Sequence, residues 1–164
     1  MGIIRILLVV PTFKYKQGYP VFLSLSDFPT GFAYLASTLK EAGHDVIGLN
    51  LNNIVGFDSA HDMIREMIHI TLEEHFDLIG TGGLAGDYKF IKDAMGAIRE
   101  ETDTPIVLGG GIVTHDAEFI FKLLKPDFCI IGEAEEAIVQ LANMVESGKN
   151  EFASIDNIGY WEEE

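Results

Sequence analysis

The sequence predicts an α/β protein built on a doubly wound sheet of five parallel strands with helices on both faces. Five short apolar runs rich in β-branched residues alternate with five segments whose apolar residues recur at helical spacing. The apolar runs are continuous, as is typical of strands that are covered on both faces. A strict repeat of strand and helix favours right-handed crossovers and a parallel sheet. The expected architecture is therefore a flavodoxin-like (Rossmann-like) three-layer sandwich.

The predicted elements follow one another without an internal repeat. The strands are expected at 3–10, 45–51, 76–81, 105–110 and 128–132, and the helices at 31–43, 59–75, 87–101, 116–125 and 135–148. The first helix aligns Phe32, Leu35 and Leu39 on one stripe and ends at Gly43. Thr114 is expected to cap the fourth helix, with Asp116 and Glu118 complementing its N-terminus.

Two segments depart from this alternation. The connection after the first strand runs for about 20 residues where 2 to 6 are usual, which indicates a functional loop. Residues 11–28 of this connection carry Phe13, Tyr15, Tyr19 and Phe22, which we interpret as either a lid over a ligand or simple packing. The α/β domain is expected to span residues 1–150, and residues 151–164 to form a linker or docking tail.

Composition and charge narrow the classes of partner. The 164 residues include 26 acidic and 11 basic side chains, for a formal net charge of −15. Such a field repels nucleic acid and anionic lipid surfaces, so neither is expected as a partner. No apolar run approaches the roughly 18 residues of a membrane span. Cys129 is the only cysteine, which excludes an internal disulfide and fits a buried thiol in a reducing cytoplasm.

Glycines gather where two of the predicted strands end. Ligands of open doubly wound sheets bind outside the carboxyl ends of the strands, so these glycines predict a groove for a flat or extended ligand. Gly109, Gly110 and Gly111 form either a tight turn or a wall of that groove. Gly80, Gly82 and Ala85 match G-x-G-x-x-A, but that dinucleotide fingerprint belongs after the first strand and needs an acid about 20 residues later. A small NAD-linked enzyme is thus a weaker alternative.

The sequence lacks the motifs that mark several other kinds of functional site. The sequence has no Walker loop, no catalytic triad and no acidic cluster after the first strand of the kind that receiver domains use. His61 and His69 lie eight residues apart without a third ligand, so we expect a solvated face and no metal site. Asp27, Asp87 and Glu133 lie near the expected groove without a spacing that assigns acid and base roles. No catalytic residue is predicted.

Four segments in a fixed order carry a resemblance to a known family. They are "FPTGFAYLASTLKEAGHDV" at 28–46, "DLIGTGG" at 77–83, "GGG" at 109–111 and "PDFCIIGEAEEAI" at 126–138. From Pro11 to about Tyr160, the chain resembles the N-terminal cobalamin-binding domain of cobalamin-dependent radical SAM enzymes, the group that includes the anaerobic magnesium-protoporphyrin cyclase. His115, just after the glycine triplet, is expected near the rim of the groove.

The resemblance implies a corrin ring across the strand ends and a nucleotide tail beside the glycine-rich turns. The cofactor-binding residues that it implies are Pro11, Thr12, Thr81, Gly82, Gly83, Leu84, Gly109, Gly110, Gly111, Gly132 and Glu133. The D-x-H-x-x-G motif, whose histidine ligates cobalt, is absent, so cobalamin is expected to bind without a protein histidine ligand. The companion S-x-L falls on Gly82, Gly83 and Leu84, with Thr81 as the nearest hydroxyl.

The resemblance covers only part of such an enzyme. With a lone cysteine, the chain lacks the C-x-x-x-C-x-x-C motif that holds the iron-sulfur cluster, so the cluster and SAM are expected in a partner domain in cis or trans. The chain is then a cobalamin-binding module without a complete active site of its own, and its tail leads toward the partner domain. The alternative is a doubly wound sensory or scaffold domain that binds a nucleotide or a protein in the same groove.

Overall fold

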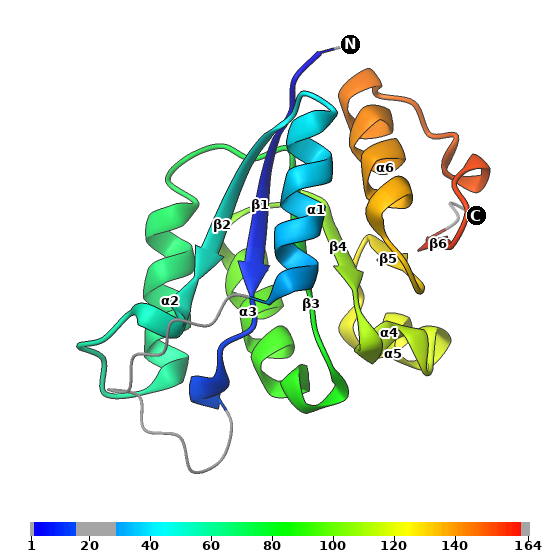
Figure 1. Ribbon diagram of the computed structural model, residues 1–164. Coiled ribbons are helices and arrows are strands. Elements are labelled where there is room, and N and C mark those ends of the chain that lie inside the picture. The colour runs from blue at the N-terminus through cyan, green and yellow to red at the C-terminus, as the bar shows by residue number, and fades with distance from the viewer. Residues whose placement is uncertain (1, 16–28, 162–164) are drawn as a thin grey trace.

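A six-stranded sheet forms the middle layer of the protein, which the computed structural model describes over residues 2–15 and 29–161 (Figure 1). The sheet contains β1 (Arg5–Val10), β2 (Asp45–Asn50), β3 (Leu78–Gly82), β4 (Ile106–Gly109), β5 (Phe128–Ile130) and β6 (Ile158–Tyr160). Their order is β2-β1-β3-β4-β5-β6. The first five strands are parallel, which confirms the doubly wound fold and its flavodoxin-like order.

Strand β6 corrects the predicted strand count from five to six. It pairs antiparallel with β5, and Ile158 lies opposite Ile130. The sequence hides this strand because it is three residues long and lacks the apolar run of the other five. Aromatic packing between distant segments holds it, since the ring of Phe152 lies 4.8 Å from that of Phe128 and 5.7 Å from that of Tyr160. That residues 151–164 lead into another domain stays a prediction.

Helices cover both faces of the sheet. One face carries α1 (Thr30–Glu41) and α6 (Glu135–Ser147); the other carries α2 (Ala60–Thr71), α3 (Tyr88–Glu101) and α5 (Ala117–Leu124). The short elements are α4 (Gly111–Thr114) and the 3-10 turns η1 (Phe13–Tyr15), η2 (Leu51–Asn53), η3 (Ala85–Asp87) and η4 (Phe152–Ser154). Within the described ranges, every helix is too short or too polar to cross a lipid bilayer.

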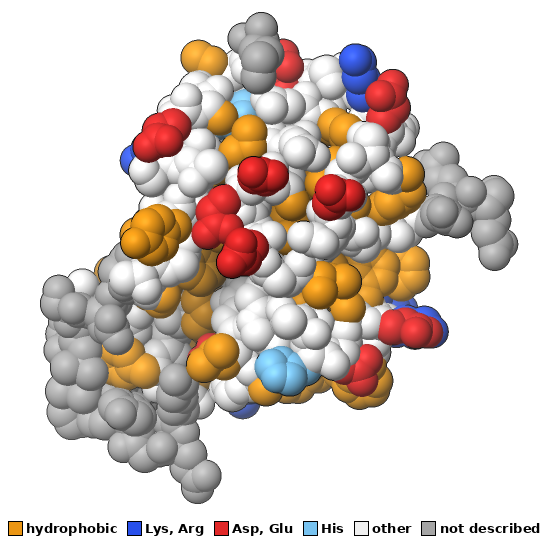
Figure 2. Space-filling model, turned by 45° about the vertical axis from the view of Figure 1, so that its right-hand side comes forward, with side chains coloured by type: hydrophobic (Ala, Val, Ile, Leu, Met, Phe, Trp, Pro, Cys, Tyr) orange, Lys and Arg blue, Asp and Glu red, His pale blue; other side chains and the backbone are white. Residues whose placement is uncertain are grey.

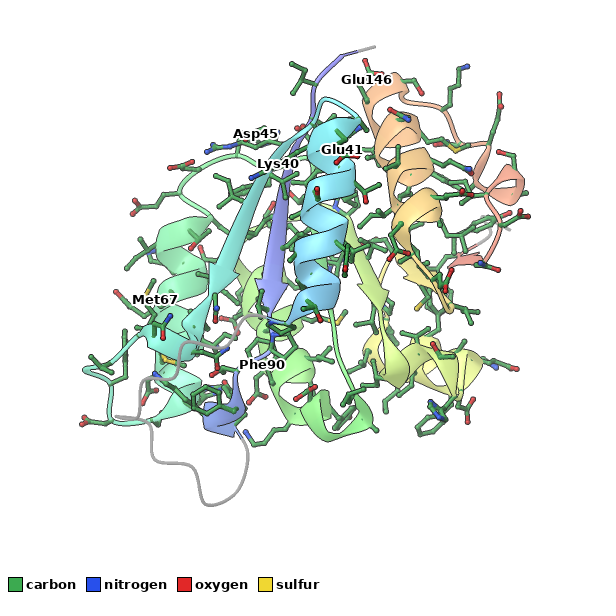
Figure 3. All side chains as sticks on the ribbon, viewed as in Figure 1. Lys40, Glu41, Asp45, Met67, Phe90 and Glu146 are labelled. Carbon is green, nitrogen blue, oxygen red and sulfur yellow. The ribbon has the colours of Figure 1, made fainter. Side chains whose placement is uncertain are left out.

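Each face of the sheet has its own hydrophobic core. Successive side chains of a strand point to opposite faces, so Leu7 of β1 packs on the α2 and α3 side while Leu8 packs on the α1 and α6 side. The segment after β1 joins the first of these cores: the ring of Tyr15 meets that of Phe90 of α3 edge-on, with centroids 5.4 Å apart. Phe90 is labelled in Figure 3. Tyr15 is therefore a packing residue. Tyr19 and Phe22, the other aromatic residues expected in a lid, lie outside the described residues, as does Asp27.

Helix α5 is capped by Asp116, and the predicted cap at Thr114 is wrong. The Asp116 carboxylate accepts the N–H of Phe119 at 3.2 Å. Thr114 instead ends α4, a short helical turn that the sequence pattern did not predict, and α5 begins at Ala117, one residue after the predicted start at 116. The Thr114 hydroxyl donates to the Gly110 carbonyl and accepts the N–H of Gly132, both at distances of 3.2 to 3.3 Å. These bonds tie the turn after β4 to the turn after β5.

Two aspartates fix the amino-terminal edge of the sheet. Asp77, just before β3, accepts the N–H of Arg5 with its carboxylate at 2.7 Å, and its own N–H donates to the Arg5 carbonyl at 2.8 Å. Asp127, just before β5, makes the same pair of bonds with Ile106, at 2.7 Å and 3.0 Å. Each carboxylate thus provides a hydrogen-bond acceptor for the backbone N–H at the start of a neighbouring strand.

The substitution Asp127→Ala is expected to lower the free energy of unfolding by about 1–3 kcal/mol, because it leaves the buried N–H of Ile106 without its acceptor. Urea denaturation checks this value. The control is Asp103→Ala at an exposed position, which is expected to change stability by less than about 0.5 kcal/mol. Equal effects of the two substitutions would contradict the assigned role of Asp127.

Burial raises the pKa of the Cys129 thiol to about 12. Because the thiolate is the reactive form, alkylation of the folded protein at pH 8 is expected to be much slower than alkylation in denaturant. Mass spectrometry after timed exposure to iodoacetamide measures both rates. Similar rates in the two conditions would show that the strand β5 region opens readily.

Candidate functional site

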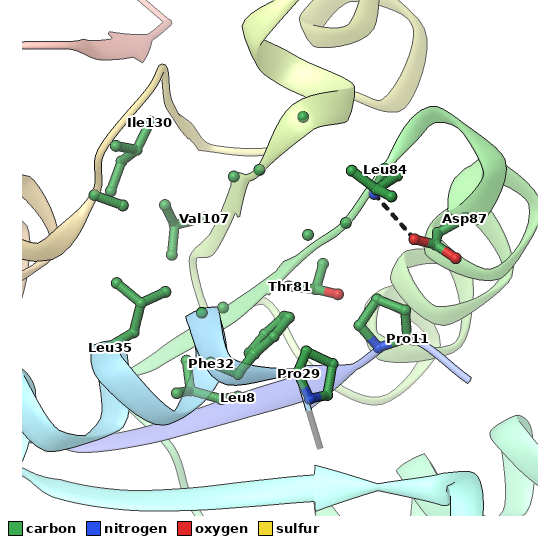
Figure 4. Close-up of a pocket in the computed structure, with 18 of the residues that line it drawn as sticks. Leu8, Pro11, Pro29, Phe32, Leu35, Thr81, Leu84, Asp87, Val107 and Ile130 are labelled. Carbon is green, nitrogen blue, oxygen red and sulfur yellow. Dashed lines mark hydrogen bonds between the residues drawn. The ribbon is translucent and has the colours of Figure 1, made fainter. Parts of the chain in front are cut away.

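A cavity of about 580 Å³ opens at the carboxyl ends of β1, β3 and β4 and extends between the sheet and helices α1 and α6 (Figure 4). It therefore lies at the edge where doubly wound sheets bind ligands, and it includes the switch point between β1 and β3. Residues in the middle of the strands line the cavity as well, so it extends from the turns at the strand ends into the space between the sheet and the helices.

Glycines form the floor of this cavity. Gly80 of β3 lies in register between Leu8 of β1 and Val107 of β4, all on the α1 and α6 side. One step nearer the strand ends on the same side, Gly82 pairs with Gly109. These positions carry no side chain: Leu8 Cδ2 would lie 2.8 Å from a Cβ on Gly80, and the cavity runs over the glycines with Leu8 and Val107 as its sides.

Helix α1 roofs part of the hollow without filling it. Leu39 is the only fully buried residue of α1 and lies in its last turns, away from the cavity. Phe32 and Leu35, nearer its N-terminus, are half-buried and point into the cavity (Figure 4). On the opposite side, Ile130 of β5 and Ile138 of α6 complete an apolar wall.

The two glycine-rich turns at the mouth lie directly against each other. The N–H of Gly83 donates to the Gly109 carbonyl at 3.3 Å, and the Gly83 carbonyl accepts the N–H of Ile112 at 2.9 Å. A Cβ on Gly82 would overlap the Gly109 carbonyl, and one on Gly110 would lie 2.8 Å from the Gly83 oxygen. Gly110 also has a φ of +87°. The chain itself therefore requires glycine at 82 and 110, whether or not a ligand binds.

Other glycines leave open space. Of the atoms in residues 2–15 and 29–161, a Cβ on Gly109 would meet only the Ile130 carbonyl oxygen, at 3.9 Å, so this part of the protein leaves room for a side chain there. Gly132 has a φ of +81° but no atom within 4 Å of an added Cβ. Gly109 and Gly132 border the cavity, so the space beside them belongs to it.

The polar groups of the cavity lie near its mouth or are bonded within the chain. The Asp87 carboxylate accepts the N–H of Leu84 at 2.9 Å, which fixes the turn after β3 and presents the Leu84 side chain at the mouth, 67% exposed. The buried Thr81 hydroxyl donates to the Val9 carbonyl at 2.9 Å. Glu133 and Glu135, both exposed, line the mouth beside α6. On the face shown in Figure 2, acidic side chains are prominent and basic ones lie at the margins.

Ten of the eleven predicted cofactor-binding residues line the cavity. They are Pro11, Thr81, Gly82, Gly83, Leu84, Gly109, Gly110, Gly111, Gly132 and Glu133. Thr12 does not, because it is buried and its hydroxyl accepts the N–H of Lys14 at 3.3 Å. Sequence reasoning missed the apolar walls, although Gly80 carries a usable signal: it precedes Gly82 by two residues and so shares its face.

The histidine side chains do not line the cavity, although His115 contacts Gly111 at its rim. All five fall within the described residues, and none lines the cavity. His115 follows α4, with Nδ1 2.9 Å from the Gly111 carbonyl. His61 lies 3.5 Å from Asp93, and His69 lies 3.0 Å from Glu101. Over residues 2–15 and 29–161, no group of three or more His, Cys, Asp and Glu side chains is arranged to hold a metal ion.

Comparisons with known proteins agree with this geometry. The family model described as "B12 binding domain" matches residues 27–142. The fold is similar to that of the radical S-adenosylmethionine methyltransferase TsrM from Kitasatospora setae, solved with cobalamin and a [4Fe-4S] cluster, at 19% identity and a TM-score of 0.74 over 96% of this chain and 27% of that one. It is also similar to the cobalamin-dependent S-adenosylmethionine radical enzyme OxsB, solved with aqua-cobalamin, at 18% identity and a TM-score of 0.76.

These structural similarities concern the fold alone. The alignment with OxsB covers 99% of this chain and 21% of that one, so the chain spans about a quarter or less of the length of either neighbour. No curated protein sequence matches the chain.

Alanine substitutions at two glycines test the contact between the turns. Gly132→Ala is expected to lower the free energy of unfolding by about 1–2 kcal/mol, the effect of a positive φ alone. Gly110→Ala is expected to lower it by about 3 kcal/mol or more, because its Cβ also meets the Gly83 backbone. Urea denaturation of the two variants measures the difference. If Gly110→Ala is no more destabilising than Gly132→Ala, the turns are not in the contact described.

Proposed function

Because the chain belongs to the B12-binding domain family, we propose that it binds cobalamin at the carboxyl ends of its strands and positions the cofactor for a radical SAM domain. The observation that carries this proposal is the hollow formed by Gly80, Gly82 and Gly109 under α1. A concave apolar site with a few polar groups at its mouth suits a large ligand with one buried arm.

The shape of the cavity supports one orientation of the cofactor. The nucleotide tail enters the hollow, where a flat base lies over the floor glycines and against the side chains of Leu8 and Val107. The corrin ring stays at the mouth, where Leu84 and Pro11 offer apolar contact. The amide groups on the corrin rim are hydrogen-bond donors, and the carboxylates of Glu133 and Glu135 are acceptors at that mouth.

Cobalamin is proposed to bind without a protein histidine ligand to cobalt. The cobalt-ligating motif is absent from the sequence, and the cavity is lined by other residue types. When bound, the cofactor supplies a cobalt centre able to carry a methyl group. The chain contributes orientation through the rigid strand ends, and it excludes water through the apolar walls of the hollow.

The remaining chemistry is assigned to a partner domain in cis or in trans. The only thiol, Cys129, is buried in β5, and a cluster of the [4Fe-4S] type needs several cysteines. The iron-sulfur cluster and SAM are therefore proposed to bind that partner domain. A dinucleotide site is less well supported, since the G-x-G-x-x-A match begins within β3, the third strand along the chain, and the next strand, β4, ends in glycines where an acid is required. A cytoplasmic location and the absence of nucleic-acid and membrane partners stay predictions.

Retention of hydroxocobalamin tests the proposal. The purified protein is mixed with the cofactor under anaerobic conditions and desalted, and its visible spectrum is recorded. Retained corrin absorbance is the expected result, and loss of all corrin on desalting would overturn the proposal for this chain. A nucleotide that raises the melting temperature while cobalamin does not would instead favour a nucleotide-binding sensory domain.

The substitution Gly109→Val places a side chain in the hollow without meeting the protein backbone closely. It is expected to weaken cobalamin binding about tenfold or more while the protein stays folded, because two methyl groups occupy space meant for the ligand. Titration of the corrin spectrum measures the dissociation constant. The matched control is Gly159→Val, also a strand glycine but with its added Cβ directed at Cys129 on the other face, 3.7 Å away. Equal affinity of both variants would place the ligand elsewhere.

A further inference from the structure

Among residues 2–15 and 29–161, the interior of the hollow offers a ligand few hydrogen-bonding partners. The side chains that enclose it are those of Leu8, Phe32, Leu35, Val107, Ile130 and Ile138. The polar side chains nearest to them already have partners: Thr81 donates to the Val9 carbonyl, and Asn52 accepts the N–H of Phe13 at 3.2 Å and donates to Asn50 at 2.8 Å. The carboxylates of Glu133 and Glu135 lie at the exposed mouth.

The main chain of the floor is equally occupied. From Ile79 to Thr81, strand β3 is paired on both sides, with β1 and with β4, so the N–H and carbonyl groups of this part point along the sheet toward the neighbouring strands; Gly82 is paired with β4. At the mouth, the Gly83 N–H and carbonyl are used in the contact with the turn after β4. A ring lying on the glycine strip therefore contacts carbon atoms on both of its faces. The main-chain groups at its edges already have hydrogen-bond partners.

We propose that this hollow selects among cobalt corrinoids by the polarity of the lower base: it accepts a benzimidazole or phenolic base and discriminates against a purine such as adenine. This inference rests on the proposed cobalamin function and on seating of the nucleotide tail in the hollow. It assigns the selectivity to the apolar enclosure, and above all to Leu35 and Val107, which face each other across the cavity in Figure 4.

The two kinds of base differ in the number of hydrogen-bonding groups that they would bring into the hollow. Adenine carries an exocyclic amine with two donors and several ring nitrogens that accept hydrogen bonds, whereas 5,6-dimethylbenzimidazole carries methyl groups in the corresponding region. Placing the purine in the hollow strips water from these polar groups without replacing its hydrogen bonds, which is unfavourable. The two bases are similar in size, so shape alone does not separate them.

Three corrinoids test the inference on the purified full chain: cobalamin, the cobamide that carries adenine as its lower base, and cobinamide, which has no nucleotide base. Cobalamin is expected to bind about tenfold or more tightly than the adenine cobamide, because at least one buried polar group is left unpaired. Cobinamide is expected to bind more weakly than cobalamin. Titrations of the visible spectrum give the three dissociation constants.

The outcomes separate this inference from the proposed function. Equal affinity for cobalamin and the adenine cobamide, both tighter than cobinamide, overturns the selectivity and leaves cobalamin binding standing. Equal affinity for cobalamin and cobinamide shows that the base does not enter the hollow, which overturns the selectivity together with the seating of the tail. Failure to retain any of the three overturns the proposed function and the inference together.

A variant of the wall adds a second readout. Leu35→Gln keeps a good helix former at a half-buried position of α1 and brings an amide to the wall of the cavity. The preference for cobalamin over the adenine cobamide, measured as the ratio of their affinities, is therefore expected to fall by about threefold or more. The matched control is Leu123→Gln, the same change on exposed α5, which is 46% exposed and does not line the cavity. An unchanged ratio in Leu35→Gln would contradict the role given to the apolar wall.

Discussion

The direct backbone contact between the turn after β3 and the turn after β4 is the constraint on which the site depends. Gly83 donates to Gly109 and accepts from Ile112, and the approach is so close that Gly82 and Gly110 cannot carry side chains. The contact anchors α4 at the mouth, and the bonds of Thr114 extend it to the turn after β5. Three strand ends are thereby held as one rigid rim, and Gly80 continues the side-chain-free strip from that rim into the sheet.

The fold and the edge of the sheet that holds the site could be predicted from the sequence, because both depend on local patterns. The strands β1, β3, β4 and β5 are apolar runs buried on both faces, whereas the edge strand β2 is only partly buried, and the helical stripes between the strands fix the alternation. Glycines at the ends of β3 and β4 then indicated the turns at the mouth. The role of those glycines was only partly foreseen: Gly82 and Gly110 serve the contact between turns, whereas Gly109 borders open space.

The parts that could not be predicted depend on contacts between distant residues. Nothing in the local sequence says that Gly80 faces α1 rather than α3, because the phase of a buried strand is set by which helix crosses which face. Strand β6 is held to β5 by pairing and by the tilted ring contact of Phe152 with Phe128, residues 24 positions apart. Asp116 and not Thr114 caps α5, because the residues from Gly111 to Thr114 form the separate helical turn α4.

The shallow seating of α1 has a consequence for the evolution of the domain. Only Leu39 of this helix is fully buried, since the strands beneath its first turns present glycines. Among the floor glycines, Gly109 has room for a side chain, which would add contacts for the fold and occupy the hollow, so stability and ligand capacity are opposed at this position. A ligand that fills the hollow supplies the apolar contacts that side chains provide in an ordinary hydrophobic core. Ligand binding and the packing of α1 on the sheet are then thermodynamically coupled, so that each favours the other.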